Sequence, residues 1–188
     1  MQLLDSTFME HATLADIKKQ LAEGVDINVQ NDAGFSPLHV AAAFNNDCAV
    51  IEALLQVGAD VNARDYRGQT PLHWAASDKK PAVVATLIAA GADVNARDKE
   101  GGSPLHRAAW WSKSPEVIEA LIAAGADVNA RTRKGTSPLH RSIGWGKNPE
   151  VTKALIRAGA DVNAKTDELP PVIAEAQREM LKIQKSLS

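Results

Sequence analysis

Gly91-Ala92-Asp93-Val94-Asn95-Ala96 is the stretch that decides the fold, because the chain repeats it. The same six letters recur at 58–63, 125–130 and 159–164, and a looser copy, Gly-Val-Asp-Ile-Asn, stands at 24–28. Successive copies begin 34, 33, 34 and 34 residues apart. A fixed period near 33 residues is typical of a solenoid, in which each repeat packs against its neighbours in the row.

A second motif, Ser/Thr-Pro-Leu-His, follows each of the first four copies, at 36–39, 70–73, 103–106 and 137–140. Its hydroxyl suits a helix N-cap, and its proline suits the first helical position, where no backbone N–H is needed. The apolar run before the next copy predicts a second helix. A glycine ends that run because a helix end often needs a positive φ. These glycines are Gly58, Gly91, Gly125 and Gly159.

The second motif resembles the Thr-Pro-Leu-His-x-Ala-Ala text of ankyrin repeats. It stands here as Ser36–Ala42, Thr70–Ala76 and Ser103–Ala109, while the fourth copy has Ser142 and Ile143 in place of Ala-Ala. The resemblance covers about residues 24–165 and implies an all-α ankyrin-repeat solenoid of antiparallel helix pairs with hairpin-like turns. It also implies that four histidines hydrogen bond the backbone between repeats: His39, His73, His106 and His140.

We expect a single domain over residues 1–188. It comprises an N-terminal capping unit (1–33), repeats at 34–67, 68–100, 101–134 and 135–166, and a C-terminal capping helix (167–188). Inner helices are predicted near 37–44, 71–77, 104–112 and 138–145, and outer helices near 48–57, 82–90, 115–124 and 149–158. Thr13, Ser114 and Asn148 are expected to cap helices at their N-termini.

Composition narrows the function classes. Lys plus Arg is 21 against 23 for Asp plus Glu, so no strong charge points to nucleic acid. A single cysteine, Cys48, excludes an internal disulfide. No apolar run of about 18 residues predicts a membrane span, and no signal peptide is visible. We therefore expect a monomer away from the membrane, in the cytoplasm by default, with a periplasmic or secreted location left open if a leader was removed.

The sequence offers no catalytic constellation. The recurring acids Asp60, Asp93, Asp127 and Asp161 belong to Asp-x-Asn turns, in which Asp and Asn bond their own backbone. No metal-binding, phosphate-loop or nucleophile motif is present. We predict a protein that is not an enzyme, with no cofactor, metal or small-molecule substrate.

Aromatic residues are the informative departure from the repeat. The resemblance implies a concave face of inner helices and turn tips, into which the pair of residues after Ala-Ala points. Here these pairs are Ala43-Phe44, Ser77-Asp78, Trp110-Trp111 and Gly144-Trp145. Because large aromatics dominate interface hot spots, we predict a partner-binding patch of Phe44, Trp110, Trp111 and Trp145. Packing within the domain is the favoured interpretation for Trp74.

The turn tips are basic. Residues 64–67, 97–100 and 131–134 carry seven basic against three acidic side chains, a local balance of +4. A field of this sign steers a protein with an acidic contact surface. The candidate partner-binding set is Phe44, Trp74, Asp78, Trp110, Trp111, Trp145, Tyr66, Arg67, Lys99, Arg107, Arg133 and Arg141.

The preferred function is therefore protein–protein interaction without chemistry. An inhibitor or immunity protein, which occludes the active site of an enzyme or toxin, is the alternative. An anion or nucleic-acid binder that uses the basic tips is a third hypothesis, which the net charge of −2 disfavours.

Overall fold

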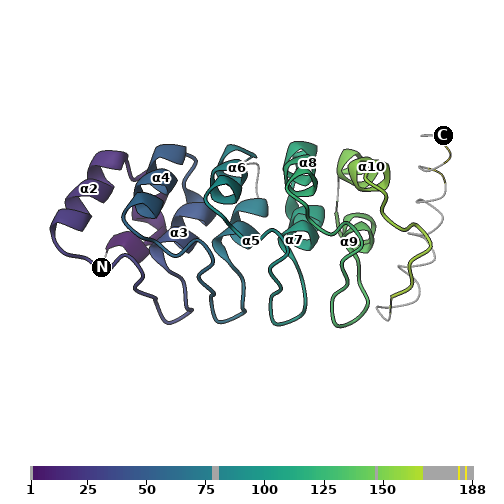
Figure 1. The fold of residues 1–188 in the computed structure, drawn as a ribbon, viewed down its shortest axis with the longest axis horizontal. Helices are drawn as coiled ribbons and strands as arrows, with labels where there is room; N and C mark the ends of the chain where they lie inside the picture. The colour runs from purple at the N-terminus through teal and green to yellow at the C-terminus, as the bar shows by residue number, and fades with distance from the viewer. Residues whose placement is uncertain (1, 78–80, 147, 167–181, 183–184, 186–188) are drawn as a thin grey trace.

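The computed structural model describes residues 2–77, 81–146 and 148–166, together with residues 182 and 185. Within these ranges the chain is helical and contains no β-strand. Its helices form antiparallel pairs that stand side by side in one row (Figure 1). The predicted all-α ankyrin-repeat solenoid is confirmed.

The helices form two layers. The N-terminal unit holds a 3-10 helix, Gln2–Leu4, followed by α1 (Ser6–His11) and α2 (Leu14–Ala22). The inner helices that follow are α3 (Pro37–Phe44), α5 (Pro71–Ala76), α7 (Pro104–Trp111) and α9 (Pro138–Gly144). The outer helices are α4 (Cys48–Gln56), α6 (Pro81–Ala89), α8 (Pro115–Ala123) and α10 (Pro149–Arg157). All eight predicted repeat helices agree with these bounds to within one residue.

The helix starts follow from local capping chemistry. The hydroxyl oxygens of Ser36, Ser103 and Ser137 accept the backbone N–H of the histidine three residues later. Thr13 caps α2, as predicted, through a reciprocal pair of bonds with Asp16. Asn148 also caps as predicted, with its Oδ1 accepting the N–H of Glu150 at 3.0 Å.

The predicted cap at Ser114 is wrong. Its hydroxyl donates to the carboxylate of Glu116 instead, and no cap bond forms at the start of α8. The carboxylate of Glu116, in the first turn of α8, thus competes for the capping hydroxyl.

The core lies between the two layers and runs the length of the row. The leucine of each Ser/Thr-Pro-Leu-His motif is completely buried, at Leu38, Leu72, Leu105 and Leu139. Each meets buried aliphatic residues of the outer helices, such as Val117, Ile118 and Leu121. Burial of one such side chain contributes about 1.5–3 kcal/mol, so the motif stabilises every unit equally.

The outer helices of the repeats end at glycines whose φ lies between 89° and 94°. Each then leads into a loop in which an Asp-x-Asn sequence bonds its own backbone: the N–H of Asn62 donates to Oδ1 of Asp60 at 2.9 Å. The loops extend beyond the inner helices, along the lower edge of Figure 1. The inner helices and these loops together are called the inner face below.

Two predictions fall outside the described residues. The C-terminal capping helix was expected at 167–188, where the structure describes residues 182 and 185 alone, and Asp78 belongs to the undescribed 78–80. The repeat pattern continues as far as Thr166, because Nη1 of Arg131 donates to the carbonyl of Lys165 at 2.5 Å.

Candidate partner-binding face

The residue that follows each motif histidine belongs to an inner helix. In successive units this residue is Val40, Trp74, Arg107 and Arg141. The side chains of the last three are partly exposed, and each contacts an aromatic or basic side chain from a neighbouring unit. Trp74 of α5 thus stacks with Arg107 of α7, and Arg141 of α9 stacks with Trp110 of α7.

Trp74 and Arg107 form the more enclosed part of this row. The guanidinium carbon of Arg107 lies 4.2 Å from the centroid of the Trp74 ring. The indole N–H of Trp74 donates to Oδ2 of Asp65 at 3.1 Å, and Nη1 of Arg107 donates to Oε1 of Gln69 at 2.9 Å. Phe35 packs edge-on against Trp74, with ring centroids 5.0 Å apart. The indole N–H of Trp74 and one N–H of the Arg107 guanidinium therefore find acceptors within the chain.

Burial has an electrostatic cost at Arg107. Burial lowers the pKa of the Arg107 guanidinium, while the negative charges of Asp65 and Asp98 raise it. The buried Nε of Arg107 has no hydrogen-bond partner among the described residues. The stack on Trp74 offsets part of this cost, because a desolvated cation–π contact contributes about 2 kcal/mol. Trp74 thus packs within the domain, in agreement with the favoured sequence interpretation.

Trp110, Trp111 and Trp145 form an open cluster at the end of α7 and α9. The rings of Trp110 and Trp111 stack with an interplanar angle of 14° and centroids 5.1 Å apart. Trp145 approaches Trp110 from the next unit, at 5.7 Å between centroids. Trp111 is 55% exposed and Trp145 is 38% exposed, while Trp110 is half-buried between them. The structure therefore brings these three sequence-predicted residues together.

Arg141 completes this indole cluster. Its guanidinium carbon lies 4.6 Å from the ring centroid of Trp110 and 5.0 Å from that of Trp145. One positive charge is therefore held against two indole faces, and this restricts all four side chains before any partner arrives. Such preorganisation reduces the entropy cost of binding.

Gly146 allows the close approach that places Trp145. The N–H of Gly146 donates to the carbonyl of Arg141 at 2.9 Å, which turns the chain sharply after α9. A Cβ at this position would lie 2.8 Å from the carbonyl oxygen of Ala109 and closer still to that of Ser142. The sequence shows Gly-Trp-Gly here, but only the packing of α9 on α7 explains why the second glycine is needed.

Phe44 and Tyr66 are exposed in the N-terminal half of the chain. Phe44, at the end of α3, is 41% exposed, and Tyr66, at a loop tip, is 62% exposed. Neither ring contacts another aromatic ring among the described residues. They belong to the predicted set but lie apart from the indole cluster.

The loop cations divide into two groups. Three arginines cross unit boundaries: Nη1 of Arg64 donates to the carbonyls of Gly68 and Arg97, and Arg97 and Arg131 repeat this one unit further on. In contrast, Arg67, Lys99 and Arg133 are exposed and make no side-chain hydrogen bond within the described ranges. The first group holds the loops together, and the second faces solvent.

Sequence reasoning missed the structural role of the first group, as it missed that of the asparagines. Nδ2 of Asn62 donates to the carbonyl of Gly91 at 3.2 Å, and its Oδ1 accepts the N–H of Asp93 at 2.8 Å. Asn28, Asn95 and Asn129 make the same pair of bonds at their own junctions. In the sequence, the signal for both structural roles was that these arginines and asparagines recur at the period of the repeat.

The four motif histidines also cross unit boundaries. Nε2 of His106 lies 2.9 Å from the carbonyl oxygen of Thr136, and its Nδ1 lies 3.1 Å from the backbone nitrogen of Ser103. Because a carbonyl can only accept and a backbone N–H can only donate, the ring is neutral with its proton on Nε2. Burial lowers the pKa of His73 and of His106 to about 4, and it lowers that of His39 as well.

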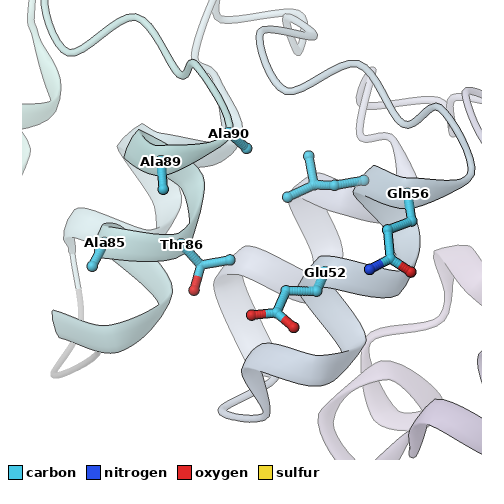
Figure 2. Close-up of a pocket in the computed structure, with 7 residues that line it drawn as sticks. Glu52, Gln56, Ala85, Thr86, Ala89 and Ala90 are labelled. Atoms are coloured by element: carbon cyan, nitrogen blue, oxygen red, sulfur yellow. The ribbon is translucent and has the colours of Figure 1, made fainter.

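The described part of the chain offers no cluster of metal-binding side chains and no helix suited to a membrane span. No group of three or more His, Cys, Asp or Glu side chains there could hold a metal ion. No described helix is long and apolar enough to cross a membrane. A shallow groove of about 500 Å³ opens between α4 and α6, on the layer opposite the loops (Figure 2). Glu52 is its one ionisable lining residue, so it offers no paired acid and base.

A family model described as "Ankyrin repeats (3 copies)" matches the sequence at residues 9–98 and again at 83–166. These matches cover most of the chain, and the chain therefore belongs to the ankyrin-repeat family. A comparison with curated proteins finds no match. Ankyrin repeats generally mediate protein–protein interaction and are typically not enzymes.

Proposed function

We propose that the protein binds a partner protein through the aromatic and basic part of its inner face. The indole cluster of Trp110, Trp111 and Trp145 is the observation that carries this proposal. Two large rings exposed next to each other retain a favourable free energy of burial that the fold itself does not use. Tryptophan is also among the residue types that dominate interface hot spots.

The proposed partner is acidic at the contact surface. Arg141 lies against the indoles, and Arg67, Lys99 and Arg133 point to solvent from the neighbouring loops. Outer helices carry exposed acids, among them Glu52, Glu116 and Glu150. A field with this polarity directs an acidic surface toward the inner face and raises its rate of association.

The test uses binders selected against the wild-type protein from a display library of small protein domains. We expect Trp111→Ala combined with Trp145→Ala to weaken their affinity about 30-fold or more, because a hot-spot residue contributes at least about 2 kcal/mol. Calorimetric titration gives the dissociation constants, and circular dichroism shows that both variants fold.

Val57→Ala is the matched control, because Val57 is an exposed apolar residue (45%) at the end of an outer helix. Equal affinities for the double variant, the control and the wild type would contradict the proposal. If a selected binder is an enzyme, its activity in the complex distinguishes the inhibitor hypothesis from binding without inhibition.

A further inference from the structure

The loop tips form one bonded row along the inner face. The N–H of Tyr66 donates to the carbonyl of Ala33 at 3.1 Å, that of Lys99 to Arg67 at 2.8 Å, and that of Arg133 to Glu100 at 2.9 Å. Each bond joins equivalent positions of consecutive units, so the tips keep a fixed order and spacing. A side chain at the donor position of one unit therefore neighbours its counterparts in the units on either side.

Charge changes sign along this row. The donor position holds Asp32 in the first loop, then Tyr66, Lys99 and Arg133, and all four are exposed. The side chains of Lys99 and Arg133 make no hydrogen bond or ion pair within the described ranges. The tips of the third and fourth loops thus present two consecutive cations that are available to a ligand.

Asp98, one of the two acids in the third loop, is already used by the fold. Oδ1 of Asp98 accepts the N–H groups of Glu100 and Gly102 at 3.0 and 2.7 Å, and its Oδ2 accepts from Gln69 at 3.2 Å. Because these bonds fix the carboxylate inside its own loop, Asp98 forms no ion pair with Lys99 or Arg133. Glu100, the other acid of this loop, is exposed and forms no ion pair with either cation within the described ranges, so neither carboxylate pairs with Lys99 or Arg133.

The indole cluster lies on the two inner helices that follow these loops. Trp110 and Trp111 end α7, Trp145 follows α9, and these inner helices directly follow the loops of Lys99 and Arg133. Phe44, in contrast, ends the inner helix that follows the loop of Asp32, so an exposed aromatic ring is not combined with a cation at the donor position there. Exposed indoles and tip cations therefore occur together at the third and fourth loops and the inner helices that follow them.

We propose that the partner contributes an acidic peptide segment that lies across α7, α9 and the two loops before them. Carboxylates of the segment pair with Lys99 and Arg133, and an aromatic or aliphatic side chain packs on Trp111 and Trp145. This assignment rests on the proposed function and adds the location of the contact and the chemistry of its occupant.

A carboxylate-bearing segment fits this surface better than a nucleic acid. The protein carries a net charge of −2, and the exposed tip cations of these two units are few. Binding to a nucleic-acid backbone requires several phosphate contacts, each of which adds to a steep salt dependence. Two neighbouring cations beside the exposed rings of the indole cluster fit a short acidic segment that carries one large apolar side chain.

The test selects twelve-residue peptides from a random phage-displayed library against the wild-type protein. We expect the selected peptides to be enriched in Asp and Glu and to share one large apolar residue. Lys99→Glu combined with Arg133→Glu is expected to weaken their affinity about tenfold or more, because both pairs become repulsive. Fluorescence anisotropy with labelled peptides at two salt concentrations gives the affinities.

Lys18→Glu combined with Lys19→Glu is the matched control. It makes the same change in net charge on α2, at exposed positions away from the inner face. A control effect equal to that of the tip variant would overturn the assignment, since it would show a general effect of charge. Absence of acidic enrichment, or of any selected peptide, would overturn it too, as would tighter binding of an oligothymidylate than of the peptides.

The outcomes separate this inference from the proposed function. Peptides without acidic residues that still require Trp111 and Trp145 would leave the binding face in place and remove the acidic segment. Acidic peptides that depend on Lys99 and Arg133, but bind the double tryptophan variant equally well, would remove the indole anchor from both proposals.

Discussion

Two stacks of arginine on tryptophan lie one repeat apart and have different environments. Arg107 and Arg141 occupy equivalent positions, yet Arg107 packs on Trp74 beside Asp65 and Gln69, whereas Arg141 packs between Trp110 and Trp145. The first stack is tied to its loop by hydrogen bonds from both partners. The second leaves indole surface open to solvent.

The comparison teaches that the neighbours of a side chain decide what it does. A tryptophan whose N–H reaches a buried carboxylate and whose face is covered by a cation stabilises the fold. A tryptophan at the end of an inner helix, beyond the reach of the loop, keeps an exposed face. Residue type and repeat position alone would have assigned the same role to Arg107 and Arg141.

The largest effect is expected from lowering the pH. Acid protonates the buried histidines at the two repeat junctions that the arginine–tryptophan stacks also span. His73 and His106 have a pKa of about 4 when folded and about 6.5 when unfolded. The unfolded state therefore binds more protons between these values, and stability falls as the pH drops from 6.5 to 4. The loss is on the order of 3 kcal/mol per histidine. Urea unfolding across this range measures it, and a flat profile would contradict the neutral rings.

The next effect separates the two stacks. Trp74→Ala is expected to lower the free energy of unfolding by about 3 kcal/mol. The substitution removes the packing of the ring against its neighbours and leaves a buried oxygen of Asp65 without its hydrogen-bond donor. Trp111→Ala should lower it by less than about 1 kcal/mol, since that ring is largely exposed. Equal losses in chemical denaturation would abolish the distinction between a structural and a binding tryptophan.

The smallest effect measures the stacks themselves. A double-mutant cycle of Trp74→Leu and Arg107→Met should give a coupling energy of about 2 kcal/mol, as expected for a desolvated cation–π pair. The corresponding cycle of Trp110→Leu and Arg141→Met should give about 1 kcal/mol. A larger coupling in the second pair would show that the open cluster, rather than the enclosed one, holds the repeats together.

The fold was readable from the sequence because its signals recur. Each Ser-Pro or Thr-Pro at the start of an inner helix and each glycine after an outer helix follows from backbone chemistry, and four copies of both leave little ambiguity in the helix bounds. The failed cap at Ser114 shows the limit of this reasoning, because a competing bond to Glu116 depends on side-chain geometry.

The candidate site was readable only in part. The indoles could be placed near one another, but exposure depends on contacts between units, as Trp110 and Trp111 show: they are adjacent in sequence and differ in burial. The loop arginines counted as surface charge, yet Arg64, Arg97 and Arg131 bond carbonyls of the following unit. Periodicity identifies what every unit needs, and departures from it identify where to look for function.

The asparagine bridges described above have an evolutionary consequence. Every boundary is closed by the same donor and acceptor pair, from Asn28 through Asn129, and none of these bonds depends on which units it joins. A duplicated block of one full period would find compatible neighbours on both sides. The array can thus grow or shrink by whole units, while the surface that recognises a partner evolves separately in one part of it.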